Sequence, residues 1–224
     1  MATVYSGARV ERIPAKLLLG EGSLWAPRLN KWLLVNIHGK AAYTLDTYGT
    51  GELRAYPLPE QVGTIVLRAP SAARAGGAEQ ALVALRSGLA VLDLGSGAVA
   101  RLPGAPAEPP GNRYNDGKCS PEGRFWVGTM EDATFSAGVG SLYVADAAAA
   151  AGAEPPPLRK ALGGVTISNG LAWSPDGRTM YYIDTPRNDV QVRCSPPWGL
   201  LLWSHSAPPG LLTFPFPLPL PPGI

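Results

Sequence analysis

The sequence predicts an all-β protein made of repeated units of four short strands. Its 224 residues include 27 glycines and 24 prolines, a share that disfavours long helices and suits strands joined by turns. Short apolar runs alternate with clusters of Gly, Pro and Asn along most of the chain. Similar turns and strands recur at a spacing of about 45 to 50 residues, which is typical of repeat architectures.

The first two units are the most regular part of the pattern. Strands are expected at residues 23–25, 32–37, 42–46 and 52–56, and again at 63–67, 81–85, 89–93 and 99–102. Turn residues separate them, and the Ala/Gly-rich stretch 69–77 is predicted to be a loop insertion. Each unit therefore reads as an antiparallel meander.

The third and fourth units carry the polar residues. Strands are expected at 125–129 and 140–145 in the third unit, and at 165–171, 180–184 and 189–192 in the fourth. The alanine run and three prolines of residues 147–157 predict a surface loop between them. Four strands in each repeated unit favour a β-propeller over a sandwich.

The end of the chain differs in composition from the rest. Residues 194–224 contain nine prolines and no Lys, Arg, Asp or Glu, and neither strand alternation nor a helical period is visible. We interpret this stretch as a non-native ending, such as a frameshifted or retained-intron translation, with a Pro-rich docking tail as the alternative. The expected organisation is a lead-in over 1–18, a partial propeller over 19–193 and a tail over 194–224.

Charge and cysteine content exclude several classes of partner. Nineteen Lys and Arg against 17 Asp and Glu leave a net charge of +2 without a polybasic run, so neither nucleic acid nor a membrane surface is expected as a partner. No apolar stretch reaches the roughly 18 residues of a membrane span, and the N-terminus lacks the apolar core of a secretory signal. Two cysteines are too few for a disulfide framework. A soluble, cytoplasmic protein is expected.

A polar cluster directly before the 125–129 strand suggests a site mounted on a sheet. Arg113, Asn115, Asp116 and Lys118 place two cations, an anion and an amide around a glycine. One alternative is that Asn-Asp-Gly, like the Ser-Pro-Glu-Gly that follows, is only turn chemistry. Another is that Arg113 simply pairs with Asp116.

Four motifs taken in order give a more specific indication. They are GEGSLW at 20–25, RYNDGK at 113–118, GRFWVGTM at 123–130 and ISNGLAWSPDG at 167–177. Each motif alone is weak, because turns of the SPDG type occur in many propellers. Together, over about residues 19–192, they closely resemble the family of regucalcin (senescence marker protein 30) and the gluconolactonases.

The resemblance implies a six-bladed β-propeller, of which about three and a half blades are encoded here, and a metal-dependent lactonase acting on a sugar lactone. It implies one divalent cation in the central channel, Ca²⁺, Zn²⁺, Mg²⁺ or Mn²⁺. By the family's motifs the metal ligands are Glu21, Asn169 and Asn115. Arg113 and Asn115 correspond to residues that contact substrate.

The chemistry of these residues agrees with the implied roles. Carboxylate and amide oxygens suit a hard cation, which would polarise the lactone carbonyl and activate the attacking water. Arg113 could orient the sugar and favour developing negative charge. A serine–histidine–acid triad is not evident, because His38 and His205 are the only histidines.

The sequence also departs from the family pattern. A further family acid falls in register on Ala133, with Glu131 and Asp132 nearby but offset. The family aspartate of a later blade, a cation ligand and the expected general base, has no counterpart, since Asp184 and Asp189 are not in its motif. No catalytic base is therefore assigned. A non-enzymatic, regucalcin-like propeller that binds calcium or a protein partner is the alternative, and an inactive, poorly folded product is the third possibility.

Overall fold

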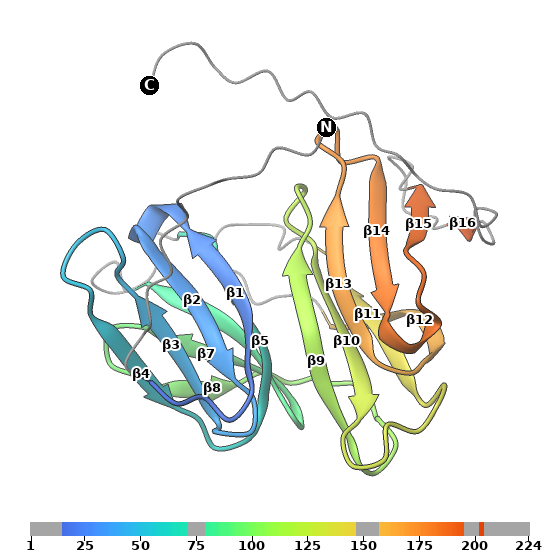
Figure 1. Ribbon diagram of the computed structural model, residues 1–224, viewed down its shortest axis with the longest axis horizontal. Helices are drawn as coiled ribbons and strands as arrows, with labels where there is room; N and C mark the ends of the chain where they lie inside the picture. The colour runs from blue at the N-terminus through green and yellow to red at the C-terminus, as the bar shows by residue number, and fades with distance from the viewer. Residues whose placement is uncertain (1–14, 71–78, 147–156, 195–201, 204–224) are drawn as a thin grey trace, which may run out of the picture.

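The computed structural model describes residues 15–70, 79–146, 157–194 and 202–203 (Figure 1). Within these ranges the chain forms sixteen strands in four antiparallel sheets of four strands each, with two short 3₁₀ turns and no α-helix. The all-β prediction is confirmed. None of the described residues form a helix long and apolar enough to cross a membrane.

The first two sheets follow the chain in simple meander order. Sheet A consists of β1 (Gly20–Ala26), β2 (Lys31–Asn36), β3 (Ala41–Leu45) and β4 (Leu53–Pro57). Sheet B consists of β5 (Val62–Leu67), β6 (Gln80–Leu85), β7 (Gly88–Asp93) and β8 (Val99–Arg101). All eight strands lie where the sequence predicted them, within a few residues.

The last two sheets have the same order. Sheet C consists of β9 (Asn112–Cys119), β10 (Phe125–Glu131), β11 (Gly140–Ala145) and β12 (Arg159–Val165). Sheet D consists of β13 (Ser168–Trp173), β14 (Thr179–Asp184), β15 (Gln191–Cys194) and β16 (Leu202–Trp203).

Three strands were not among those expected: β9, which is an inner strand, and β12 and β16, which lie at the outer edges of their sheets. β12 was not predicted from the sequence, and Val165, expected to open the fourth unit, ends this strand instead. Most of β12 is exposed or half-buried, so it needs no alternating apolar pattern. The two-residue β16 pairs with β15 inside the stretch expected to lack strands, so sheet D has its full set of strands. Predictions for residues 71–77, 147–156, 195–201 and 204–224 lie outside the described residues.

The first strand of each sheet lies on the inside of the assembly. β5 contacts β1 and β9, and β9 contacts β5 and β13. The arrows of β1, β9 and β13 point the same way (Figure 1). Their first residues therefore gather at one end of the molecule, which we call the site end. In each sheet the turn between the second and third strands lies at this end too, because the strands are antiparallel.

Each pair of neighbouring sheets is held together by one hydrophobic cluster. Alternation along a strand sends successive side chains to opposite faces of the sheet. In β10, Phe125 and Val127 pack with Leu82 of sheet B, whereas Trp126 packs with Tyr182 of sheet D. The inner sheets are thus buried on both faces, which explains their nearly continuous apolar runs.

A close backbone approach fixes β5 against β9. A Cβ atom placed on Gly63 would lie 2.5 Å from the carbonyl oxygen of Tyr114 and 2.4 Å from that of Asn115. One residue along, the Thr64 hydroxyl donates a 2.8 Å hydrogen bond to the carbonyl oxygen of Gly117. The polar segment of β9 is therefore held directly by the backbone of sheet B.

Replacing Gly63 with alanine should destabilise the protein, because the new methyl group meets backbone atoms that cannot rotate away. We expect a loss of about 1–3 kcal/mol in the free energy of unfolding, measured by urea titration. Gly163→Ala is the matched control, because nothing lies within 4 Å of a Cβ at Gly163. Equal unfolding midpoints for the two variants would contradict the close approach.

Candidate active site

Arg113 is the most deeply placed charged residue of the polar segment on β9. Its side chain is 4% exposed and its Nε lies 2.5 Å from Asp132 Oδ1. Nη1 donates to Asn115 Oδ1 at 2.6 Å and to the carbonyl oxygen of Tyr114 at 3.1 Å. The alternative pairing with Asp116 is thus not the one observed. β10 ends at Glu131, opposite the start of β9, which brings the next residue, Asp132, beside Arg113.

Asn115 connects sheet C to sheet D. Its Nδ2 donates a 2.8 Å hydrogen bond to the carbonyl oxygen of Ser168, the first residue of β13. The Asn-Asp-Gly sequence lies inside β9, where the pairing with β10 shifts register, so the interpretation of this tripeptide as a turn is wrong. That interpretation is right for Ser120 to Gly123, where the Gly123 N–H donates to the Ser120 carbonyl and Gly123 has a φ of 81°.

Asp116 brings a second carboxylate to the region of Glu21. Its carboxylate accepts a 2.8 Å hydrogen bond from the backbone N–H of Gly117. Burial raises the pKa of the Asp116 carboxyl, and the negative charge of Glu21 adds to this, against the lowering effects of the Gly117 N–H and Lys118. From the sequence, Asp116 was expected as the anion of the polar cluster, with pairing to Arg113 as an alternative, and not as a neighbour of Glu21. Its electrostatic coupling to Glu21 depends on the packing of separate sheets.

Glu21 and Asn169 occupy equivalent positions in sheets A and D. Each is the second residue of an inner strand, Glu21 of β1 and Asn169 of β13. Glu21 is exposed, whereas Asn169 is half-buried and donates through Nδ2 to the Thr185 hydroxyl at 3.0 Å. The backbone N–H of Gly170 lowers the pKa of the Asp116 carboxyl, and the charge of Glu21 raises it. Asp116 therefore lies near both β13 and β1. Their roles as metal ligands stay predictions.

Of the three positions considered for the family acid after Gly-Thr-Met, only Asp132 reaches Arg113. Ala133 is exposed and its backbone N–H donates to Glu131. The hydroxyl of Thr134, with the backbone N–H groups of Ala133 and Thr134, lowers the pKa of Glu131 to about 2. Glu131 therefore organises its own loop and does not face the guanidinium.

Asp132 also receives a hydrogen bond and an ion-pair contact from sheet B. Gln61 Nε2 donates to Asp132 Oδ2 at 2.8 Å, and Arg86 Nη1 lies 3.6 Å from the same oxygen. Partial burial tends to raise the pKa of Asp132, but the hydrogen bonds from Arg113 and Gln61 outweigh it, and the net shift is downward. Sequence reasoning missed Gln61, whose only signal is its position directly before an inner strand.

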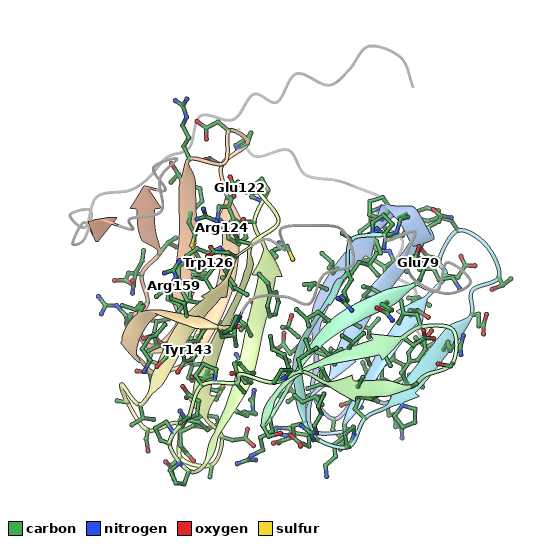
Figure 2. All side chains as sticks on the ribbon, turned by 180° about the vertical axis from the view of Figure 1, so that it is seen from behind. Glu79, Glu122, Arg124, Trp126, Tyr143 and Arg159 are labelled. Atoms are coloured by element: carbon green, nitrogen blue, oxygen red, sulfur yellow. The ribbon has the colours of Figure 1, made fainter. Side chains whose placement is uncertain are left out.

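A half-buried carboxylate, that of Glu108, also fixes the start of β9. Glu108 accepts hydrogen bonds from Asn112 Nδ2 at 2.6 Å, from the Thr129 hydroxyl at 2.8 Å and from the Tyr143 hydroxyl. Burial and Glu108 together raise the pKa of Tyr143, which is labelled in Figure 2, to about 12. The strand that carries Arg113, β9, is therefore held at its start by Glu108 in addition to its contacts with sheet B.

The donor set at the site end fits a hard cation. Glu21 and Asp116 supply carboxylates whose mutual repulsion a cation would offset, and Asn169 Oδ1 has no hydrogen-bond partner among the described residues. Asn115 Oδ1 accepts one bond from Arg113, and an amide oxygen has two lone pairs. No three His, Cys, Asp or Glu side chains come together in the described part of the chain, so amide oxygens would have to complete the set. Such oxygen ligands suit Ca²⁺, Mg²⁺ or Mn²⁺ better than Zn²⁺.

Four-stranded meanders with parallel inner strands, and a polar site where those strands begin, define the chain as a protein of the β-propeller class. Residues 19–194 match the model of the family described as SMP-30/Gluconolactonase/LRE-like region, and the chain belongs to this family. The resemblance stated from the four motifs is therefore confirmed.

Relatives with assigned names are sugar lactonases and regucalcins. The chain is 34% identical over 171 residues to 6-deoxy-6-sulfogluconolactonase of Pseudomonas putida, covering 76% of this chain and 53% of the relative. It is 31% identical over 175 residues to L-arabinolactonase of Azospirillum brasilense, covering 78% and 53%. It is 30% identical over 171 residues to regucalcin of Xenopus laevis, covering 75% and 52%. The chain thus spans about half the length of these relatives.

Solved structures show the same fold. A calcium-binding protein, regucalcin of Agrobacterium tumefaciens, superposes with a TM-score of 0.67 at 28% identity, covering 84% of this chain and 60% of that one. A luciferin-regenerating enzyme superposes with a TM-score of 0.68 at 25% identity, covering 82% and 58%.

Removing the carboxylate of Asp132 should destabilise the fold strongly, because it leaves a buried guanidinium without its counter-ion. For Asp132→Ala we expect a loss of about 3 kcal/mol in the free energy of unfolding near pH 7. Asp146→Ala is the control: Asp146 is 58% exposed and lies 3.6 Å from Arg124 and 3.9 Å from Arg159. Its loss should stay within about 1 kcal/mol.

The effect of Asp132→Ala should also depend on pH. The folded-state pKa of Asp132 is lowered, so its stabilising contribution is complete above the unfolded-state pKa of about 3.9 and is lost as the pH falls through the folded-state value. The stability difference between the wild type and Asp132→Ala should therefore shrink below about pH 4. Equal losses for the Asp132 and Asp146 variants at pH 7 would contradict a buried, tightly paired Arg113.

Proposed function

We propose that this chain carries a metal-dependent sugar lactonase site, which opens the ring ester of a sugar lactone by attack of water. The observation that carries the proposal is the grouping of Arg113 and Asn115 with the carboxylates of Asp116 and Glu21 at the site end. The names of the relatives 6-deoxy-6-sulfogluconolactonase and L-arabinolactonase support a sugar lactone as the substrate class.

Glu21, Asn169 and Asn115 would hold the divalent cation, with Asp116 adding negative charge beside them. When bound, such a cation supplies polarisation of the lactone carbonyl and lowers the pKa of a coordinated water. The calcium-binding description of the Agrobacterium tumefaciens regucalcin supports a divalent ion in this family. A cation would also offset the repulsion between the Asp116 and Glu21 carboxylates.

Arg113 is the group that would act on the substrate directly. Its Nε and Nη1 are engaged by Asp132, Asn115 and the Tyr114 carbonyl, while Nη2 has no hydrogen-bond partner among the described residues. A guanidinium held at two nitrogens offers the third in a fixed direction. It can donate to an oxygen of the lactone and stabilise the negative charge that develops there as water attacks.

Lactone hydrolysis should depend on added cation. In a pH-stat assay with gluconolactone, we expect protein treated with EDTA to be inactive and Ca²⁺, Mg²⁺, Mn²⁺ or Zn²⁺, added singly, to restore acid release, because the carbonyl needs polarisation. Hydrolysis that is equally fast with EDTA would contradict the proposal. Thermal stabilisation by Ca²⁺ without hydrolysis would instead indicate a non-enzymatic calcium-binding propeller.

A matched pair of variants tests the role of Glu21 in cation binding. Glu21→Gln keeps the shape of the side chain but removes its charge, so cation affinity measured by titration calorimetry should fall by about 10- to 100-fold. Glu122→Gln makes the same change in the β9–β10 turn, at the opposite end of sheet C from the site end (Figure 2). It should leave both affinity and hydrolysis unchanged. Unchanged affinity in Glu21→Gln would show that Glu21 is not a ligand.

A further inference from the structure

Gln61 joins three sheets through one side-chain amide. It lies directly before β5 in sheet B, where its Oε1 accepts a 2.8 Å hydrogen bond from Arg86 Nη1. Its Nε2 donates to Asp132 Oδ2 in sheet C at 2.8 Å and lies 3.0 Å from His38 Nδ1 in sheet A. His38 follows β2, so all these groups belong to the site end.

The chemistry of its partners fixes the orientation of the Gln61 amide. The guanidinium of Arg86 can only donate and the carboxylate of Asp132 can only accept, so turning the amide over would place like groups against each other. An NH₂ group can only donate, so His38 Nδ1 is the acceptor in this contact. The direction of the amide is therefore set by Arg86 and Asp132.

The contact with Gln61 determines how Asp132 meets Arg113. Gln61 occupies Oδ2 of the carboxylate, and Oδ1 is left for Arg113 Nε at 2.5 Å. Arg113 in turn donates to Asn115, and Asn115 to the carbonyl oxygen of Ser168. A continuous hydrogen-bonded path thus runs from sheet A through B and C to sheet D.

Arg86 is a competitor for the same carboxylate. Its Nη1 lies 3.6 Å from Asp132 Oδ2, and Gln61 Oε1 now accepts its hydrogen bond. Without the Gln61 side chain, Arg86 loses that acceptor and can turn to Asp132. Asp132 would then be drawn away from Arg113, and the guanidinium would lose its fixed direction.

We propose that Gln61 is a positioning residue for Arg113 and acts through Asp132. Gln61 does not itself contact the substrate. It holds the carboxylate in the orientation that aims the free Nη2 of Arg113 at the site end. The effect on catalysis rests on the proposed lactonase function, whereas the effect on the guanidinium does not.

The orientation of Arg113 can be measured without any substrate. In full-length protein labelled with ¹⁵N-arginine, the Nε–H signal of Arg113 is identified by its loss in Arg113→Lys. In Gln61→Ala we expect this signal to move and its exchange with solvent to quicken by at least about tenfold, since a charge-assisted hydrogen bond is weakened. Gln61→Glu, which places a second negative charge beside Asp132, should change it further.

Gln80→Ala is the matched control, since Gln80 also lies in sheet B and also accepts a hydrogen bond from an arginine, Arg68 Nη1, at 2.9 Å. Gln80 begins β6, at the end of sheet B away from the site end, so the Arg113 signal should stay in place. An Arg113 signal with the same position and exchange rate in Gln61→Ala as in the wild type would overturn the inference, whatever the activity.

Kinetics then separates the inference from the proposed function. For gluconolactone hydrolysis, kcat/KM should fall by about tenfold in Gln61→Ala, and the double variant Gln61→Ala/Asp132→Asn should fall no further than Asp132→Asn alone. Losses that multiply would overturn the route through Asp132. A displaced Arg113 signal with unchanged kcat/KM would support the positioning role and contradict the catalytic role given to Arg113.

Discussion

A buried guanidinium needs a carboxylate within hydrogen-bonding distance, and the site end of this protein is arranged around that requirement for Arg113. An unpaired charge in this position would cost several kcal/mol. Asp132 meets the need from the end of β10, Gln61 holds Asp132 from sheet B, and Asn115 accepts a hydrogen bond from Arg113 within β9. The pair therefore couples the packing of the sheets to the geometry of the site.

The close approach of β5 and β9 makes this arrangement possible. Gly63 allows the backbone of sheet B to touch β9, and the same contact brings Gln61 to Asp132. Sheet A contributes His38 and Glu21, and sheet D contributes the Ser168 carbonyl and Asn169. A site built from several sheets is possible only because the inner strands begin at the same end, as is general for a propeller with repeated meanders.

The sequence predicted the fold well wherever the signal is local. Alternation and turn residues located nearly every inner and middle strand, because those strands are buried and their turns need Gly, Pro or Asn. β12 was missed because Arg159–Val165 is largely exposed and carries no apolar pattern, and β9 because its polar residues are typical of a turn. The two-residue β16 lies in the Pro-rich stretch that shows no strand alternation. The candidate site residues Glu21, Arg113, Asn115 and Asn169 followed from the motifs of the family. Their contacts did not, because the Arg113–Asp132 pair depends on register and Gln61 approaches from another sheet.

The central claim is that Glu21, Asn115 and Asn169 converge on one cation, and paramagnetic broadening by Mn²⁺ tests it most directly. In a ¹H–¹⁵N spectrum with a small fraction of Mn²⁺, the amide signals of Gly22, Gly117 and Gly170 should lose intensity together and recover when excess Ca²⁺ is added. The signals of Gly123 and Gly177, in the β9–β10 and β13–β14 turns away from the site end, should stay sharp. Broadening that is uniform, or centred on those turns, would contradict the account.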